Sequence, residues 1–397
     1  MNPIFNQNAL NAMMDQLKAR YLDTGVLPNL GVAITNTEET VFEAHDGFAD
    51  LDQNIPISPQ HHYRIYSMTK PITCLALMQL YERGLVNLNT PVKEYFPALG
   101  NLQVYRSGVG QSIETSPAAS DITLHQLLTH SSGLTYGFNQ SHPVEALYHD
   151  RHIDYVHRFP REAWIQELAS MPLMFDPGTA WNYGVSTDVI GFVVEVITGK
   201  SLGEYFKDEI FDPIGMHETS FRYTGAPERM TSCYLTQNGK TSVHDAFDQS
   251  EFSKSWPSCS GGSGLISTHR DYLRFMKMLL AKGLFDGNQI IGRKTLELMH
   301  QNHLPNGLGM VEHSVGGFTE NRHRGVGYGL GFSHRYDVAI SGVNGSIGEY
   351  GWGGMAGTNF WIDPKEQFGV LFTTQMLPSS AYDIRSDLRA MIYGALV

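Results

Sequence analysis

A serine and a lysine three residues apart, Ser67 and Lys70, have the types and spacing that acyl transfer needs. Positions i and i+3 share one face of a helix, so we expect the hydroxyl and the amine within hydrogen-bonding distance. The start of a helix adds the positive end of the helix dipole and an unpaired backbone N–H beside the serine. The pair therefore predicts a nucleophile, an amine that activates it and one donor for an oxyanion. The simpler interpretation is a serine that caps the helix and a solvated lysine.

The helix that carries this pair is expected over residues 67–84, with apolar side chains on nearly all sides. Such a pattern is typical of a helix buried at the centre of a domain. Gly84 ends it well. Pro71 fits only in the first turn of a helix, where its missing N–H has no partner to lose. The helix must therefore begin at or just before Ser67.

Strands are predicted near both ends of the chain and helices in its middle. The strand patterns cover residues 30–34, 40–44, 328–334, 358–362 and 368–374, and helices are expected at 123–130, 186–198, 268–282 and from about residue 380. We expect an α/β fold of the α+β kind, in which strands from both chain ends form one antiparallel sheet flanked by helices. Residues 1–85 and 251–397 would form this domain, and residues 86–250 an inserted, mostly helical domain. The active site is expected in the cleft between them.

Five separated motifs relate the chain to a known family. They are Tyr-Ser-Met-Thr-Lys-Pro-Ile-Thr at 66–73, Leu-Leu-Thr-His-Ser-Ser-Gly-Leu at 127–134, Trp-Asn-Tyr-Gly-Val-Ser-Thr-Asp-Val-Ile-Gly at 181–191, Gly-Gly-Ser-Gly-Leu-Ile-Ser at 261–267 and Trp-Gly-Gly at 352–354. In this order, from about residue 30 to 363, the set resembles the serine β-lactamase and penicillin-binding-protein superfamily. More closely it resembles the family VIII carboxylesterases, which have a class C β-lactamase fold.

The resemblance implies a role for each matching residue. Ser67 would be the acyl-accepting nucleophile, Lys70 its partner and Tyr183 the catalytic tyrosine, while the backbone N–H groups of Ser67 and Met355 would form the oxyanion hole. A Lys70 ammonium would lower the pKa of the Tyr183 phenol and make it a base, but a neutral Lys70 is an equally acceptable base. The sequence leaves these two assignments open.

Two departures from the β-lactamase pattern indicate the substrate. Trp352, Gly353 and Gly354 match the strand triad whose sequence in β-lactamases is Lys-Thr-Gly. At the first of these positions the indole of Trp352 therefore replaces the lysine cation. Val185 stands where β-lactamases carry an asparagine that holds an amide. We expect these four positions to contact an uncharged, apolar ester, and β-lactam hydrolysis to be weak or absent.

Other motifs predict less. The segment Gly261-Gly-Ser-Gly-Leu265 misses the G-x-S-x-G pattern by its last residue, which disfavours a lipase-type nucleophile. Residues 137–160 are rich in aromatic side chains and are expected either to cover the acyl pocket as a lid or to form a plain surface loop. Cys74 is expected to be a small core residue.

Histidines form two H-x-x-H pairs, His149 with His152 and His300 with His303, and His157 is close to the first pair. Two such side chains on one helical face are able to bind zinc. The chain has no H-E-x-x-H motif and no neighbouring cysteine pair, so we expect no metal and no other cofactor.

Composition limits the function classes. The chain has 397 residues, 28 Lys and Arg against 40 Asp and Glu, and a net charge of −12, which disfavours nucleic acid as a partner. Three cysteines do not make a disulfide framework, and we find neither a signal peptide nor a run of about 18 apolar residues that a membrane span needs. We expect a cytoplasmic protein whose partner is a small ester. Nothing in the sequence indicates an oligomeric state.

The predicted function is that of a serine carboxylesterase for short-chain or aryl esters, acting through a Ser67 acyl-enzyme. An acyltransferase of the same superfamily would use the same residues, and a β-lactamase or D-aminopeptidase is less favoured. From other classes, the alternatives are a non-catalytic binding protein with the same fold and a zinc hydrolase.

Overall fold

The computed structural model of the protein describes residues 4–316 and 324–397. One eight-stranded sheet dominates it, with strand order β12-β13-β14-β15-β16-β1-β2-β3 and every neighbouring pair antiparallel. Its strands are β1 (Asn29–Thr35), β2 (Thr40–Asp50), β3 (Ile55–Pro56), β12 (Val326–Tyr328), β13 (Ser333–Arg335), β14 (Tyr350–Gly353), β15 (Asn359–Asp363) and β16 (Phe368–Thr373).

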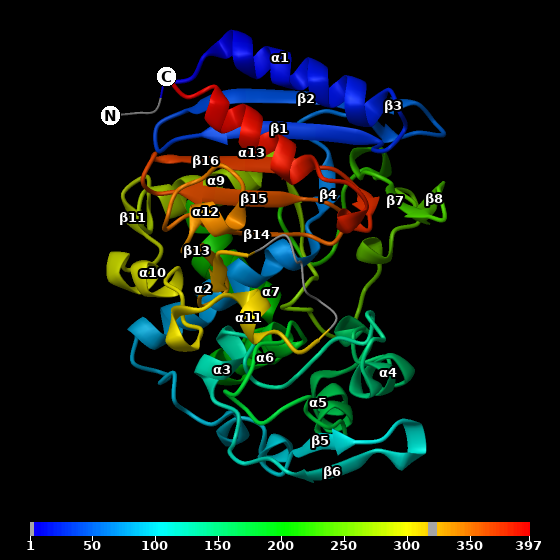
Figure 1. Ribbon diagram of the computed structural model, residues 1–397, viewed down its shortest axis with the longest axis vertical. Coiled ribbons are helices and arrows are strands. Elements are labelled where there is room, and N and C mark those ends of the chain that lie inside the picture. The colour runs from blue at the N-terminus through cyan, green and yellow to red at the C-terminus, as the bar shows by residue number, and fades with distance from the viewer. Residues whose placement is uncertain (1–3, 317–323) are drawn as a thin grey trace.

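The two ends of the chain meet in the middle of this sheet. Strand β1 pairs with β16 along five residue pairs, from Gly31 opposite Thr373 to Thr35 opposite Gly369. Figure 1 shows the blue N-terminal strands directly beside the red and orange C-terminal strands. This confirms the predicted antiparallel sheet built from both chain ends.

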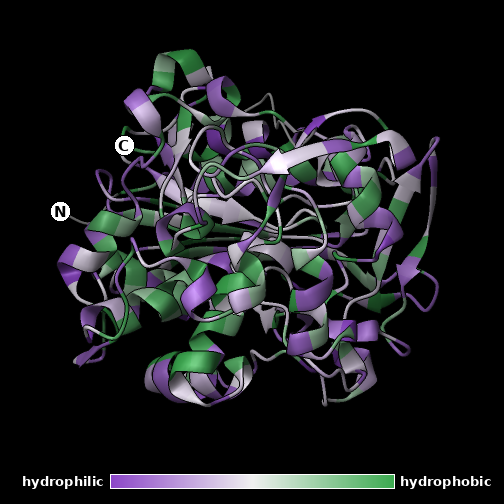
Figure 2. Ribbon diagram, turned by 90° about the horizontal axis from the view of Figure 1, so that it is seen from below, coloured by the Kyte–Doolittle hydropathy of each residue, from purple (hydrophilic) through white to green (hydrophobic). Residues whose placement is uncertain are grey.

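Helices cover both faces of the sheet because the strands alternate apolar side chains between two cores. Helices α1 (Gln7–Leu17) and α13 (Ile384–Gly394) pack on one face, where Val32 and Val370 point. Helices α2 (Thr69–Glu82) and α9 (His269–Leu280) belong to the larger core on the other face. In Figure 2 many helices carry hydrophobic and hydrophilic residues on one ribbon, as expected where one side faces a core and the other faces water.

In the middle of the chain, α-helices outnumber strands. Its helices are α3 (Leu124–Leu128), α4 (Pro143–Asp150), α5 (Arg161–Ala169), α6 (Ser186–Thr198), α7 (Leu202–Phe206) and α8 (Asp212–Ile214), and its strands are β5 (Gln103–Ser107), β6 (Glu114–Pro117), β7 (Cys233–Gln237) and β8 (Lys240–Asp245). Strand β7 also pairs in parallel with β17 (Met376–Leu377) near the end of the chain. The division into domains at residues 85 and 250 stays a prediction.

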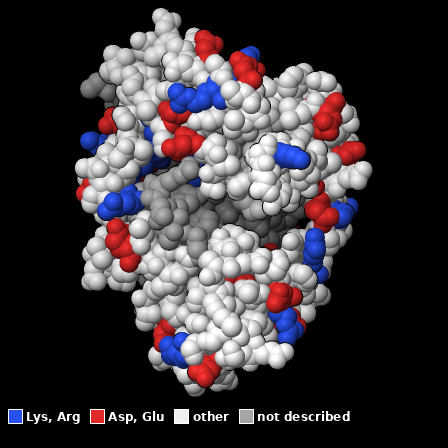
Figure 3. Space-filling model, turned by 45° about the vertical axis from the view of Figure 1, so that its right-hand side comes forward, with Lys and Arg blue, Asp and Glu red and all other residues white. Residues whose placement is uncertain are grey.

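Short elements complete the fold. They are β4 (His62–Arg64), which pairs with β9 (Ile266–Thr268), β10 (Leu284–Phe285) and β11 (Asn288–Gln289), α10 (Arg293–Met299), α11 (Met310–His313) and α12 (Val338–Ser341). On the face shown in Figure 3, acidic and basic side chains are interspersed, so this face has no large patch of one charge.

One predicted strand is wrong in its extent. The pattern at 328–334 is not a single strand but the end of β12, a tight turn and the start of β13. In the turn Gly329 N–H donates to Phe332 C=O at 2.7 Å, and Gly331 has a φ of 96°, which only glycine adopts easily. The last helix likewise begins at Ile384, later than predicted.

Candidate active site

Ser67 lies in a short 3₁₀ turn, η2 (Tyr66–Met68), that leads directly into α2. The first hydrogen bond of this turn runs from Met68 N–H to Ile65 C=O at 3.0 Å. The N–H of Ser67 therefore precedes the bonded donors of the helix, as the oxyanion role requires. Tyr66, just before the serine, has a φ of 42°, a left-handed conformation that costs on the order of 1–3 kcal/mol and turns the chain sharply into the helix.

Lys70 reaches Ser67 from the first turn of α2. Its Nζ lies 3.2 Å from Ser67 Oγ, 2.9 Å from the Tyr136 hydroxyl and 2.9 Å from the carbonyl oxygen of Gly262. The side chain is completely buried. An ammonium has three N–H donors, so these three contacts satisfy the group fully and fix its direction.

Burial sets the charge of this amine. Desolvation lowers the pKa of Lys70 to about 7, and the nearby carboxylate of Asp188 opposes this shift. Asp188 is also completely buried, and it accepts hydrogen bonds from Ser260 Oγ at 2.6 Å and from Gly262 N–H at 2.9 Å. Lys70 therefore changes its protonation state near neutral pH, which is what a group that accepts and returns a proton needs.

Tyr183 lies beside Lys70, before the start of α6. The Lys70 Nζ is 4.5 Å from the centre of the Tyr183 ring, and Trp352 Nε1 donates a hydrogen bond to the Tyr183 hydroxyl at 3.1 Å. His130 packs against Tyr183, with the centres of the two rings 4.9 Å apart. Burial lowers the pKa of His130 far below 6.5, so this imidazole is neutral.

The Trp352 strand supplies the opposite wall. Strand β14 contacts η2, and Ser67, Tyr183, Trp352, Gly353, Gly354 and Met355 all line one cavity. A Cβ on Gly354 would lie 2.1 Å from Thr358 Oγ1 and 2.6 Å from the carbonyl oxygen of Ile65. Only glycine therefore allows this strand end to approach the chain just before Ser67.

The cavity has a volume of about 1360 Å³. Residues of the predicted lid contribute Phe138, Tyr148 and Tyr155 to its wall, together with polar groups between them. The segment at 137–160 therefore faces the cavity. Val185 differs from the other predicted substrate contacts: it is fully buried and is not among the described residues that line the cavity.

Sequence reasoning missed three residues of this site. Tyr136 follows the 127–134 motif and Asp188 lies inside the 181–191 motif, so the sequence motifs could have pointed to both residues. Their signal was a polar group in an otherwise apolar segment. Arg385, from α13, was not foreseen: its guanidinium would lie 2.6 Å from a Cβ on Gly353, and it lines the cavity. The cavity wall therefore has a cation beside the Trp352 strand, although not at the family's lysine position.

The two predicted histidine pairs lie in different parts of the structure. His149, His152 and His157 line the cavity. His300 stacks on Tyr350 at 4.4 Å, whereas His303 is hydrogen-bonded to His125 at 3.1 Å. Cys74 is buried in the core, as predicted.

Comparison with known proteins assigns the chain to a family. The chain matches the Beta-lactamase family over residues 11–393 and belongs to it, within the superfamily of serine hydrolases with the β-lactamase fold. It is 31% identical over 383 residues to Protein Rv1367c of Mycobacterium tuberculosis strain H37Rv, which covers 94% of this chain and 90% of that protein.

Two further relatives are similar over nearly the full length. Esterase EstB of Burkholderia gladioli is 27% identical over 396 residues, covering 94% of this chain and 90% of the esterase. The solved structure of EstCE1, a hydrolase with promiscuous acyltransferase activity, has a TM-score of 0.78 at 23% identity and covers 98% of this chain and 99% of that one. The resemblance to a family VIII esterase-like β-lactamase fold is thereby confirmed. Within the described residues, none of the helices has the length and apolar character to cross a membrane.

Proposed function

We propose that this protein is a carboxylesterase that hydrolyses short-chain or aryl esters through an acyl-enzyme on Ser67. The observation that carries the proposal is the position of Lys70. A fully buried amine lies 3.2 Å from a serine hydroxyl, and burial lowers its pKa to about 7. Such an amine is neutral often enough at pH 7 to accept the serine proton. The relation to Esterase EstB supports the ester as the substrate class.

Acylation follows from this arrangement. Ser67 Oγ attacks the ester carbonyl carbon while its proton passes to neutral Lys70, and the backbone N–H groups of Ser67 and Met355 stabilise the oxyanion. When the carbon–oxygen bond to the alcohol breaks, Lys70 returns the proton to the leaving alkoxide. Water then repeats the sequence on the acyl-enzyme and releases the carboxylic acid. Tyr183, beside Lys70, takes part in these proton transfers.

The cavity wall favours an apolar ester. Trp352 presents an indole where the related β-lactamases have a cation, so a substrate carboxylate lacks its partner at that position. Arg385 also lines the cavity beside this strand, near Gly353. We propose neutral esters as the main substrates, and a cytoplasmic location in which all three cysteines stay free thiols.

The test is hydrolysis of p-nitrophenyl acetate and butyrate by the wild type and by Ser67→Ala. The variant should lose nearly all turnover. The control is Ser201→Ala, which removes another serine at a helix start, where it caps α7. This control should remain active, at a loss of about 1 kcal/mol in stability. Wild-type turnover by Ser67→Ala would show that the serine is not the nucleophile.

An acyltransferase is the second candidate. It would use the same acyl-enzyme and transfer the acyl group to an alcohol or amine in place of water. The large cavity, about 1360 Å³, has room for a second acceptor, and EstCE1 combines hydrolase and acyltransferase activity. Adding an alcohol to the assay and measuring the ratio of new ester to free acid decides between the two, since a transferase yields mostly the new ester.

A further inference from the structure

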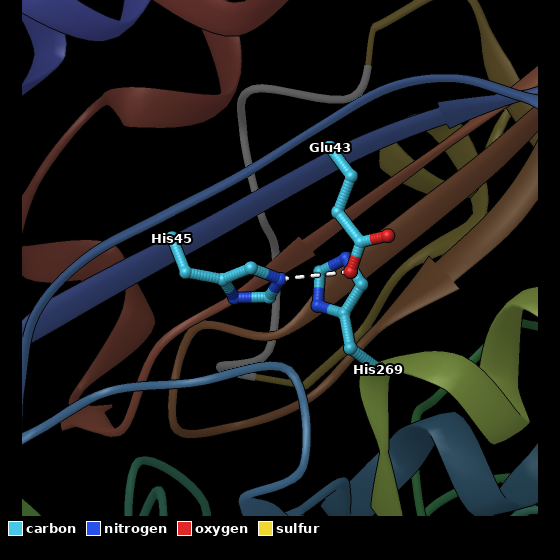
Figure 4. Close-up of side chains that lie close together, drawn as sticks. All are labelled: Glu43, His45 and His269. Atoms are coloured by element: carbon cyan, nitrogen blue, oxygen red, sulfur yellow. Dashed lines mark hydrogen bonds and ion pairs between the residues drawn. The ribbon is translucent and has the colours of Figure 1, made fainter.

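Three side chains with metal-binding atoms meet outside the catalytic cavity. Glu43 and His45 lie two residues apart on β2 and so share one face of the strand, and His269 is the first residue of α9. One possible ligand atom from each lies within 4.8 Å of the other two, and Figure 4 shows the three side chains converging. Glu43 Oε1 is 3.0 Å from His45 Nε2, and the two imidazole rings are 4.6 Å apart.

The surrounding chain leaves room for the His45 ring. Gly31 stands directly opposite His45 in the pairing of β1 with β2. A Cβ on Gly31 would lie 2.8 Å from His45 Nδ1 and 2.6 Å from Thr373 Oγ1. Any other residue at this position would therefore displace the imidazole. The short strand β3 pairs only with the far end of β2, so it does not cover the edge at Glu43, which is exposed to solvent.

Two nitrogens of this group lack partners. Among the described residues, His45 Nδ1 and His269 Nε2 are buried and have no hydrogen-bond partner. Only His269 Nε2 bears on a metal ion, because His45 faces Glu43 with its other ring nitrogen, Nε2. His269 is completely buried, and a hydrogen bond of 3.2 Å between its Nδ1 and Thr373 Oγ1 fixes the direction of its ring. A buried polar atom without a partner is unfavourable unless something binds it.

We propose that Glu43, His45 and His269 bind a divalent first-row transition metal ion, with Zn²⁺ as the best fit. Two imidazoles and one carboxylate form a common zinc ligand set, and water completes the fourth position. Calcium and magnesium prefer oxygen ligands throughout and fit less well. With metal–ligand bonds of about 2.0–2.2 Å, the ligand atoms need to be within about 4 Å of one another. The three atoms lie within 4.8 Å of one another without an ion, so binding requires only a small approach of the side chains.

The ion would hold the start of α9 against the edge of the sheet. Strand β9, which ends at the residue before His269, pairs with β4, and β4 leads into the turn with Ser67. None of the three ligands is among the described residues that line the catalytic cavity. The expected role is therefore structural, and it is independent of the ester chemistry.

Zinc binding to the full chain, first stripped of metal with a chelator, tests the proposal. Calorimetric titration with Zn²⁺ should give one site per chain, and the melting temperature should rise with Zn²⁺ concentration. Glu43→Gln and His269→Ala should each weaken binding by about tenfold or more. The control is His217→Ala, because His217 is an exposed histidine that also faces a carboxylate, that of Asp212 at 3.4 Å, but belongs to no group of three ligands among the described residues.

The binding data either support or overturn the zinc site. A single site that is lost in both variants and kept in His217→Ala supports the proposal. If His269→Ala does not fold, Glu43→Gln decides alone, since Glu43 is exposed and its removal leaves the core intact. Absence of a one-to-one site in the wild type, or equal affinity in wild type and Glu43→Gln, overturns the proposal.

Discussion

Replacing Lys70 with methionine should abolish ester hydrolysis and change the way stability depends on pH. Methionine has a similar length and no charge. Burial lowers the pKa of Lys70 from 10.5 to about 7. One pKa unit corresponds to about 1.4 kcal/mol, so the buried ammonium destabilises the folded protein by about 5 kcal/mol at pH values below 7.

The pKa values of Lys70 in the folded and unfolded states determine whether stability rises or falls with pH. In the unfolded chain Lys70 stays protonated up to its ordinary pKa of 10.5, whereas in the folded protein it loses its proton near 7. Between these values the unfolded state binds more protons, so the stability of the wild type rises with pH. This group alone contributes about 1.4 kcal/mol of added stability from pH 6 to pH 8. Lys70→Met lacks this contribution.

Asp188 also makes the stability of the wild type, relative to Lys70→Met, rise with pH. The charge of Lys70 lowers the pKa of Asp188, while burial raises it. Without Lys70 the pKa of Asp188 rises further above that of an unfolded aspartate. A raised carboxyl pKa makes the folded protein less stable as pH increases. The stability of the wild type relative to Lys70→Met should therefore increase from pH 6 to pH 8.

Urea unfolding at pH 6, 7 and 8 measures this difference, with Lys200→Met as the control. Lys200 is an exposed lysine paired with Asp208 at 2.8 Å, which raises its pKa, so its removal should leave the pH dependence unchanged. In the same range, kcat/KM of the wild type should fall about tenfold per pH unit below about pH 7. Equal pH slopes for wild type and Lys70→Met, or a kinetic limb near pH 10, would refute the assignment of Lys70 as a base of lowered pKa.

Three further results are expected. Trp352→Phe removes the 3.1 Å hydrogen bond to the Tyr183 hydroxyl, and kcat/KM should fall by up to about tenfold, the equivalent of about 1.4 kcal/mol. Unchanged kinetics would mean that the bond has no role in the reaction. Gly354→Ala places a Cβ 2.6 Å from the carbonyl oxygen of Ile65 and should reduce kcat strongly, whereas Gly394→Ala, with no atom within 4 Å of the new Cβ, should have full activity in the same assay. Nitrocefin should be hydrolysed far more slowly than p-nitrophenyl butyrate, and comparable rates would contradict the substrate argument from the Trp352 indole.

The sequence by itself determined the local parts of this protein. Three-residue spacing was enough to place Ser67 and Lys70 on one side of a helix start, because a helical turn brings such positions together whatever surrounds it. Strand patterns near both chain ends were enough to predict one antiparallel sheet, since each pattern reports only which residues face a core. The turn at Gly331 shows the limit, because a short apolar run does not reveal where a strand reverses.

Only the tertiary structure decided which distant groups meet. Tyr136 hydrogen-bonds Lys70 from a separate segment, and the burial of Lys70 results from packing between elements. The approach of β14 to Ser67 depends on the missing Cβ of Gly354. Glu43 and His269 converge because α9 begins beside the edge of the sheet. Spacing along the chain carries no information on such contacts, since each is set by how elements far apart in sequence pack on one another.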